Sequence, residues 1–390
     1  MMYQLLWLLC WLTASALASA AGADEAPADS WPMFRGCPAG TGRTAAALSL
    51  PLKERWHRAF EKTAFEATPV IADGTIYIGD LDGGFHALAL ATGETKWTFK
   101  TEAGFPSAAA VSTAAALPLV VVGDGDGLVR AFDTATGAVQ WEYATDGEIS
   151  GGPTIVPDGA AARVLVGSQD ASLSCLNLAD GALLWKHSIA DQIRCSPTLA
   201  GGKVFLAGCD GKLHVIDAAT GTEQSAIAID GPTGTTPAAH QSRLFFGTEG
   251  GAFFCIDFGS ASVAWKIAPA VNAQSYRSSA ALADGLAIVG SRGKAVEAFA
   301  IADGARKWRQ PVRGRVDGSP VVVHEEGSQR LVALVGDSAG RIAALNATDG
   351  KPVWEFDAGG GFTSSPAVAD GHVVMAAEDG TIWCFQSARQ

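Results

Sequence analysis

The chain has 390 residues, of which 48% are hydrophobic and 17% are charged, and its formal net charge is −12. This apolar content excludes a disordered chain, and its 46 glycines do not recur at every third position, as a collagen helix requires. The acidic balance excludes nucleic acid as an expected partner, because binding a phosphate backbone needs clustered Lys and Arg.

The first twenty residues predict a secretory signal peptide. They carry no charged side chain, and an apolar stretch precedes Ala18-Ser19-Ala20, which has the small-residue spacing of a cleavage site. The stretch is about 13 residues long, too short to span some 30 Å of hydrocarbon. We therefore expect residues 1–20 to be removed. The mature protein is then exported to the periplasm or the extracellular space, with no membrane span after cleavage.

Residues 21–48 are expected to form an extended N-terminal segment, and residues 49–390 a single repeat domain. One repeated pattern begins with a small residue, continues through a turn that usually contains Gly, and ends ten residues later in Trp. Glycine in the turn permits positive φ, so each copy predicts a β-hairpin. The indoles are expected to fill space between neighbouring units. The seven copies end in Trp97, Trp141, Trp185, Ser225, Trp265, Trp308 and Trp354, and a further indole of the same kind, Trp56, lies before the first complete copy.

A second repeated pattern lies upstream of each hairpin. Ser or Thr followed by Pro, or a small-residue substitute, opens an apolar run, and a turn then leads to another run. Each repeat therefore contains four short strands. The period between Trp56 and Trp354 averages about 43 residues, which is typical of four-stranded propeller blades.

The two ends of the array predict how the ring closes. Trp56 lies in a strand with no preceding hairpin half, whereas Asp379 to Cys384 form a hairpin half with no following Trp strand. Each end supplies what the other lacks. The sequence thus predicts an all-β, eight-bladed β-propeller of four-stranded antiparallel blades, closed by pairing of the N-terminal strand with the C-terminal half-blade, which removes exposed sheet edges.

The pattern from Ala131 to Trp141, small-x-Asp-x-x-Thr-Gly-x-x-x-Trp, resembles the repeat of pyrroloquinoline quinone (PQQ) repeat propellers. The opening Trp31-Pro32-Met33-Phe34-Arg35-Gly36 is similar to the start of many exported members. The resemblance covers residues 31–390 and implies the propeller fold. It does not select a function, since the family includes quinoprotein dehydrogenases and non-catalytic, BamB-like propellers.

The positions that vary most between repeats lie three residues before the Pro position of each inner strand. Equivalent positions of eight blades converge on one mouth of the central channel, so we predict a binding rim there, because ligand groups sit in loops held by a rigid frame. The alternative is that these charges pair with each other and with water. The predicted rim consists of Glu66, Pro106, Ser150, Arg194, Gly234, Arg277, Asp317 and Thr363.

Six cysteines follow the signal peptide. Cys175, Cys255 and Cys384 occupy the small-residue position of three different repeats and are expected to be buried thiols. Cys195 and Cys209 lie nearly opposite each other across one predicted hairpin, so a disulfide between them is one of two alternatives. No metal-ligand motif is present, and the seven histidines are scattered among repeats, so we expect no metal site.

Three classes of function remain open. The resemblance to quinoprotein dehydrogenases implies PQQ with calcium as the cofactor and Glu66 and Asp317 as candidate ligands. However, those enzymes carry an adjacent pair of cysteines and long insertions, and this chain has neither. We therefore favour an exported, monomeric and non-catalytic scaffold without a cofactor. Its rim would bind another exported or envelope protein. A propeller that binds a small molecule or glycan is the third alternative.

Overall fold

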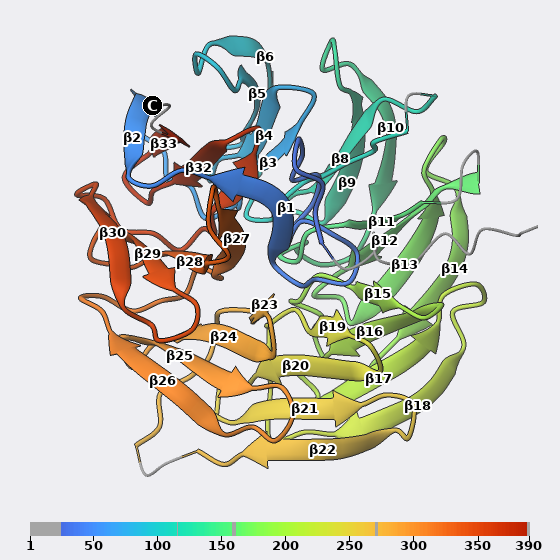
Figure 1. The fold of residues 1–390 in the computed structure, drawn as a ribbon. Helices are drawn as coiled ribbons and strands as arrows, with labels where there is room; N and C mark the ends of the chain where they lie inside the picture. Colours follow the sequence, from blue (N-terminus) through green and yellow to red (C-terminus); the bar gives the residue numbers. More distant parts are fainter. Residues whose placement is uncertain (1–24, 115, 158–160, 270–271, 388–390) are drawn as a thin grey trace, which may run out of the picture.

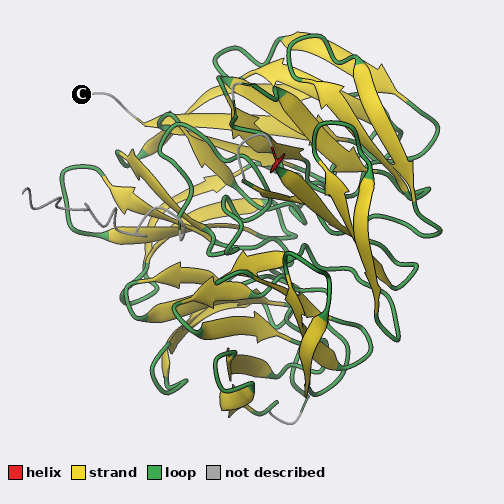
Figure 2. Ribbon diagram, turned by 90° about the vertical axis from the view of Figure 1, so that its right-hand side faces the viewer, coloured by secondary structure: helices red, strands yellow, loops and turns green. Residues whose placement is uncertain are grey.

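The computed structural model describes residues 25–114, 116–157, 161–269 and 272–387. Eight sheets surround a central channel (Figure 1), so the predicted eight-bladed propeller is confirmed. Strands and loops make up nearly all of the fold (Figure 2). The predicted signal peptide lies outside the described residues. Within them, no helix is long and apolar enough to cross a membrane.

In the four consecutive strands of blades 1 to 7 the chain runs from the innermost strand to the outermost, and each strand is antiparallel to the next. Blades 1 to 4 consist of β3 (Val70–Ala72), β4 (Thr75–Gly79), β5 (Gly84–Ala89) and β6 (Thr95–Lys100); β7 (Ala110–Val111), β8 (Leu119–Gly123), β9 (Leu128–Asp133) and β10 (Val139–Ala144); β11 (Thr154–Val156), β12 (Arg163–Gly167), β13 (Ser172–Asn177) and β14 (Leu183–Ser188); β15 (Thr198–Ala200), β16 (Lys203–Ala207), β17 (Lys212–Asp217) and β18 (Glu223–Ala228). Blades 5 to 7 consist of β19 (Ala238–His240), β20 (Arg243–Gly247), β21 (Phe253–Asp257) and β22 (Ser262–Ile267); β23 (Ala281–Ala283), β24 (Leu286–Ser291), β25 (Ala295–Ala300) and β26 (Arg306–Pro311); β27 (Val321–Glu325), β28 (Leu331–Gly336), β29 (Arg341–Asn346) and β30 (Pro352–Asp357).

Blade 8 joins the two ends of the chain. Its three inner strands are β31 (Ala367–Ala369), β32 (His372–Ala376) and β33 (Thr381–Ser387), and β2 (Leu52–Ala59) forms its outer strand. β2 pairs with β33 along its length, with Leu52 opposite Ser387 and Ala59 opposite Thr381. This confirms the predicted closure and leaves the ring without an open blade.

The segment before β2 lies inside the ring, where Figure 1 shows it in blue. Its last part, β1 (Arg43–Leu48), pairs in parallel with β27 as a fifth strand of blade 7. The residues before β1 bond to the free edges of other inner strands: Trp31 pairs with Ile71, and carbonyls of the segment accept hydrogen bonds from backbone amides of β7, β15, β19 and β23. The segment thus supplies partners to strands whose inner edges would otherwise be unpaired.

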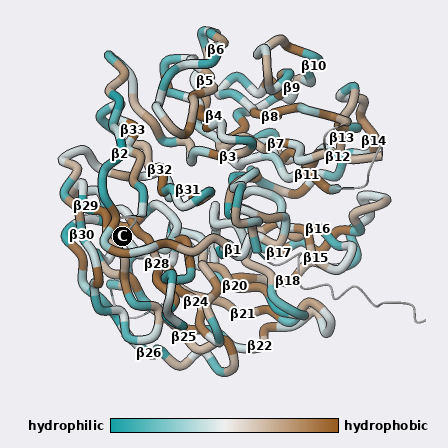
Figure 3. The backbone as a smooth tube through the Cα atoms, turned by 45° about the horizontal axis from the view of Figure 1, so that its top comes forward, coloured by the Kyte–Doolittle hydropathy of each residue, from teal (hydrophilic) through white to brown (hydrophobic). Residues whose placement is uncertain are grey.

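Each blade buries its middle strands and exposes alternate residues of its outer strand. The second strand β4 is buried along its length, whereas β6 alternates between exposed and half-buried residues. This period of two is the pattern of a strand with one packed face. Figure 3 shows the same division, with hydrophobic stretches along strands such as β20 and hydrophilic stretches near β6.

Six of the repeated tryptophans pack on the turn glycine of the following blade. A Cβ atom at Gly181, for example, would lie 2.7 Å from Cε3 of Trp141, so this turn has room only for hydrogen. In five cases the indole N–H also donates to a backbone carbonyl of that blade, at 2.8 to 3.0 Å. The exception is Trp185, whose buried Nε1 has no hydrogen-bond partner in the described part of the chain. Where Ser225 replaces Trp, the ring of Phe258 packs 4.8 Å from that of Phe205.

Candidate functional site at the channel mouth

The structure brings all eight predicted rim positions to one cavity at the mouth of the channel. Each precedes an inner strand by a few residues, so the rotational repeat of the blades places them in a circle. A cavity of about 160 Å³ lies inside this circle, and a wider funnel of about 440 Å³ opens above it. Both spaces are lined by Glu66, Pro106, Ser150, Arg194, Gly234, Arg277, Asp317 and Thr363.

A ring of hydrogen bonds lies directly below the rim. The residue before each Pro position is Ser or Thr in six blades, and the backbone amide of one of these residues donates a hydrogen bond to the side-chain hydroxyl oxygen of the equivalent residue in the next blade. Five consecutive links have lengths of 2.8 to 3.0 Å. They connect Ser196, Thr236, Ser279, Ser319, Ser365 and Thr68. These links fix the spacing of the rim positions above them.

Phe34 of the N-terminal segment lines the same cavity as the ring of hydroxyls. It lies where two blades lack a hydroxyl and carry Ala108 and Gly152 instead. A Cβ atom at Gly152 would lie 3.4 Å from Cβ of Phe34, so a larger side chain would compete with the phenyl group for this space. The cavity is therefore built jointly by the blades and by the segment inside the ring.

Two predicted rim charges are paired with residues that the sequence analysis did not identify. Arg292 donates two hydrogen bonds to the Asp317 carboxylate, at 2.8 and 2.9 Å. This carboxylate raises the pKa of the Arg292 guanidinium above its ordinary value. Nε of Arg277 donates to Oε1 of Glu249 at 2.9 Å, and both side chains are partly exposed. These two rim charges therefore pair with surrounding residues and not with each other.

The other two charged groups of the rim have no ion pair within the described residues. Arg194 donates to the neutral amide oxygen of Gln192 at 2.9 Å, so its positive charge has no acid partner in the described part of the chain. Glu66 likewise has no ion pair there. The hydroxyl of Thr363 is buried and has no hydrogen-bond partner among the residues that the structure describes. The wider mouth also includes Glu148, so it presents separate acidic and basic groups rather than one sign of charge.

The residues of the mouth do not fit PQQ with calcium. Of the described residues that line the wider mouth, none is aromatic, so a planar quinone has no ring to stack on there. Both oxygens of Asp317 accept hydrogen bonds from Arg292, which leaves this expected calcium ligand engaged by a guanidinium. We therefore derive no quinone chemistry for this site.

The cysteines near the channel are free thiols. Cys195 is buried and Cys209 is half-buried, and the disulfide that the sequence offered as an alternative is not formed between them. Burial raises the pKa of Cys195 to about 12, so it is protonated at neutral pH. Cys175, Cys255 and Cys384, at the small-residue positions of their blades, are buried thiols as well.

The fold and the site define a class of protein: a closed β-propeller with charged residues at the channel mouth and the N-terminal segment inside the ring. A family model described as outer membrane protein assembly factor BamB matches residues 40–152, 125–226, 210–334 and 318–389. The chain belongs to this family of PQQ-repeat propellers, which confirms the resemblance found in its sequence.

Individual proteins resemble the chain in sequence or in fold. The chain is 40% identical over 52 residues to outer membrane protein assembly factor BamB of Shewanella oneidensis, an alignment that covers 13% of each protein. BamB from Moraxella catarrhalis superposes with a TM-score of 0.68 at 18% identity, covering 86% of this chain and 99% of that one. Quinohemoprotein alcohol dehydrogenase from Comamonas testosteroni superposes with a TM-score of 0.73 at 14% identity, covering 95% and 82%. These two superpositions show the shared fold alone.

Proposed function

We propose that this protein is an exported, non-catalytic scaffold that binds another envelope protein at the channel mouth. The observation that carries the proposal is the contrast within the repeat. The ring of Ser and Thr below the mouth is nearly uniform, whereas the rim above it differs from blade to blade. A uniform frame that holds different side chains on loops is the arrangement expected of a specific binding surface.

The partner class follows from the chemistry of the mouth. The funnel contains acidic residues next to arginines and has polar walls, so it suits a protein segment with charges of both signs. Among the described residues of the funnel, Arg194, Glu66 and Glu148 are the charged groups that are not already matched by an ion pair. The name of the matching family, an outer membrane protein assembly factor, supports a partner in outer-membrane assembly.

The experiment places a photoreactive amino acid at Ser150 or Thr363 of the rim in cells that export the protein. Matched positions are Lys53 and Lys307, which lie exposed on the outer strands β2 and β26. We expect a discrete crosslinked product from the rim positions only, and its loss in an R194A/R277A variant. The K53A/K307A variant removes the same charge from the outer strands and should retain the product.

Two results would contradict the proposal. One is crosslinking of equal strength from the rim and from the outer strands. The other is a rim product that persists in R194A/R277A. Sequencing the N-terminus of the exported chain tests the location separately, since export with cleavage predicts a mature chain that begins at Ala21.

A further inference from the structure

Three side chains with metal-ligating atoms meet where blade 3 packs on blade 4. They are His187 of β14, His214 of β17 and Glu223 of β18, and their ligand atoms all lie within 4.8 Å of one another. Oε2 of Glu223 is 2.6 Å from Nδ1 of His214 and 3.5 Å from Nε2 of His187. The sequence analysis missed this cluster because its spacing matches no ligand motif and its residues come from two blades.

The fold explains why these side chains converge. His187 follows Trp185 by two residues, so both lie on the face of β14 that packs on blade 4. Between β17 and β18 the register shifts, so that Val215 pairs with Ser225 but Ile216 pairs with Glu223. This bulge brings Glu223 to the same face of the sheet as His214, which lies two residues before Ile216.

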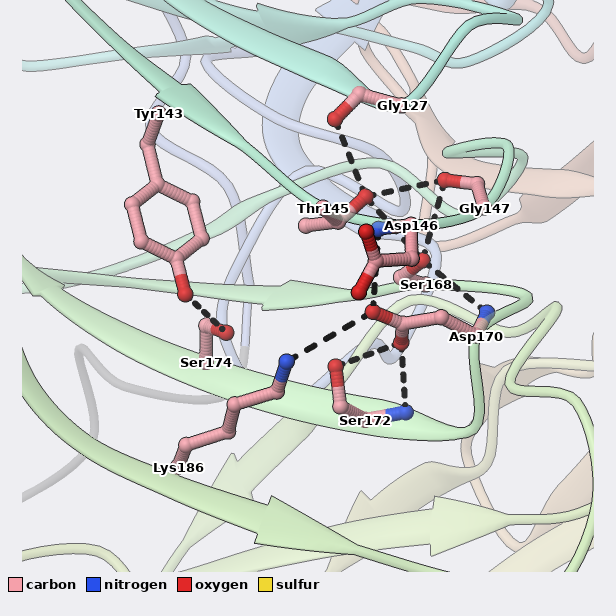
Figure 4. A network of polar contacts seen from close by, with 10 residues as sticks. All are labelled: Gly127, Tyr143, Thr145, Asp146, Gly147, Ser168, Asp170, Ser172, Ser174 and Lys186. Carbon is pink, nitrogen blue, oxygen red and sulfur yellow. Dashed lines mark hydrogen bonds and ion pairs between the residues drawn. The ribbon is translucent and has the colours of Figure 1, made fainter.

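The neighbouring blade boundary shows what this position ordinarily contains. Tyr143 is the equivalent of His187 and Ser174 the equivalent of His214, counted from the repeated Trp and small residue. Figure 4 shows their hydroxyl groups in contact, at 3.1 Å. One boundary earlier, the guanidinium of Arg130 lies 5.4 Å from the ring centre of Phe99. The side chains at these two equivalent positions thus contact each other across successive blade boundaries. Of these three boundaries, only that of blades 3 and 4 has histidines at both positions.

The surroundings of the two imidazoles are those of metal ligands. Nε2 of His214 lies 3.0 Å from a carboxylate oxygen of Asp210, and both side chains are buried. A carboxylate that accepts one ring N–H leaves the other nitrogen, here Nδ1, to coordinate. Nε2 of His187 is buried and forms no hydrogen bond with any described residue, although Oε2 of Glu223 lies 3.5 Å away. A buried polar atom without a partner is unfavourable, and a bound cation would satisfy it.

We propose that His187, His214 and Glu223 bind a divalent transition-metal ion of the zinc type. Zinc takes imidazole nitrogen and carboxylate oxygen in tetrahedral sites, and the partly exposed Glu223 leaves a fourth position for water. Two neutral imidazoles with the carboxylates of Glu223 and Asp210 balance the charge of a divalent ion. The ion would replace a proton now shared between His214 and Glu223 and would join blade 3 to blade 4. This boundary is also the one where the Trp185 indole lacks its hydrogen bond.

The test is calorimetric titration of the chelator-treated, purified protein with zinc chloride. We expect one zinc ion per chain, and affinity at least about tenfold weaker in H187Y and E223Q. H187Y introduces the residue type found at the equivalent Tyr143 and should preserve packing. H86Q is the matched control, because His86 has the same register in blade 1 and contacts Asp80 and Thr98 without a second histidine. Its affinity should equal that of the wild type.

A second measurement separates binding at this site from loss of folding. Zinc should raise the melting temperature of the wild type, and a chelator should reverse the rise, because a ligand that binds only the folded state stabilises it. The melting temperature of H187Y should be insensitive to zinc while its circular dichroism spectrum matches the wild type. The proposal is overturned if the wild type shows no saturable binding, or if folded H187Y binds zinc as tightly as the wild type.

Discussion

The backbone amide of Ser365 donates a hydrogen bond of 3.0 Å to Oγ1 of Thr68, although the two residues are 297 positions apart. Ser365 precedes the inner strand of blade 8 and Thr68 that of blade 1. The bond therefore joins the last blade to the first at the channel, while the pairing of β2 with β33 joins the ends of the chain at the outer edge of blade 8. The ring is thus closed by contacts both at the channel and at the outer edge of blade 8.

The T68A variant should lose stability because it leaves the buried amide of Ser365 without an acceptor. We expect the free energy of unfolding to fall by about 1–3 kcal/mol, the cost of an unsatisfied buried group. Urea unfolding followed by circular dichroism measures it. The control is T95A on the exposed face of β6, with an expected change within about 0.5 kcal/mol. Equal midpoints for T68A and T95A would show that this link contributes nothing to closure.

The indole of Trp141 should contribute far more to stability than the residue at the equivalent position of blade 4. Trp141 packs on Gly181 and donates to the carbonyl of Leu178, so W141A removes both a large contact and a hydrogen bond. We expect a loss of about 3–5 kcal/mol. S225A should change the free energy of unfolding by less than about 0.5 kcal/mol. Similar losses in the two variants would be inconsistent with our account of the blade boundaries.

Two glycines with the same backbone angle test how tightly the N-terminal segment is packed. Gly42 and Gly74 both have a φ of +62°, so an added methyl group costs similar backbone strain at each. At Gly74 nothing lies within 4 Å of the added Cβ, whereas at Gly42 it would lie 1.7 Å from Nη2 of the buried Arg35. We expect G42A to be less stable than G74A by about 1–3 kcal/mol, the cost of overpacking. Thermal melts of both variants measure the difference, and matching melting temperatures would contradict it.

Thiol labelling should distinguish Cys209 from the other cysteines of the described chain. Cys209 is half-buried, whereas Cys37, Cys175, Cys195, Cys255 and Cys384 are buried. At pH 8 a thiol reagent should therefore modify one cysteine of the native protein quickly and the rest only after unfolding. Prior reduction should leave this count unchanged. A pair of thiols that becomes titratable only after reduction, and is absent in C195A, would instead demonstrate the Cys195–Cys209 disulfide.

The buried thiol of Cys195 should make the folded protein less stable as the pH rises above about 8.5. Burial raises the pKa of Cys195 to about 12, compared with about 8.5 in an unfolded chain. The folded protein therefore keeps this proton where the unfolded chain loses it. Its stabilising contribution is complete below about pH 8.5 and declines as pH rises towards 12. Urea midpoints should fall over this range, and the fall should be smaller in C195A than in C209A, because Cys209 is less buried.

Local sequence patterns were sufficient to predict the blades. The ten-residue interval between small residue and Trp, with a glycine-containing turn between them, describes one hairpin, and hairpins form from contacts close in sequence. The complementary ends of the array also determined the closure, because an unmatched Trp56 strand and an unmatched half at Cys384 can only complete each other. Even the mouth of the channel follows from repetition, since equivalent positions of a ring must form a circle.

The repeat pattern could not predict which side chains contact each other across neighbouring blades. The partners of the rim, Arg292 for Asp317 and Glu249 for Arg277, lie in other loops, and their choice depends on side-chain reach across neighbouring blades. The path of residues 26–48 inside the ring depends on the free edges of inner strands that exist only once the ring has formed. The meeting of His187 with His214 depends on which faces of two sheets are pressed together. These relationships are non-local, so only the packed tertiary structure determines them, whereas the periodic strands and turns were determined by the sequence itself.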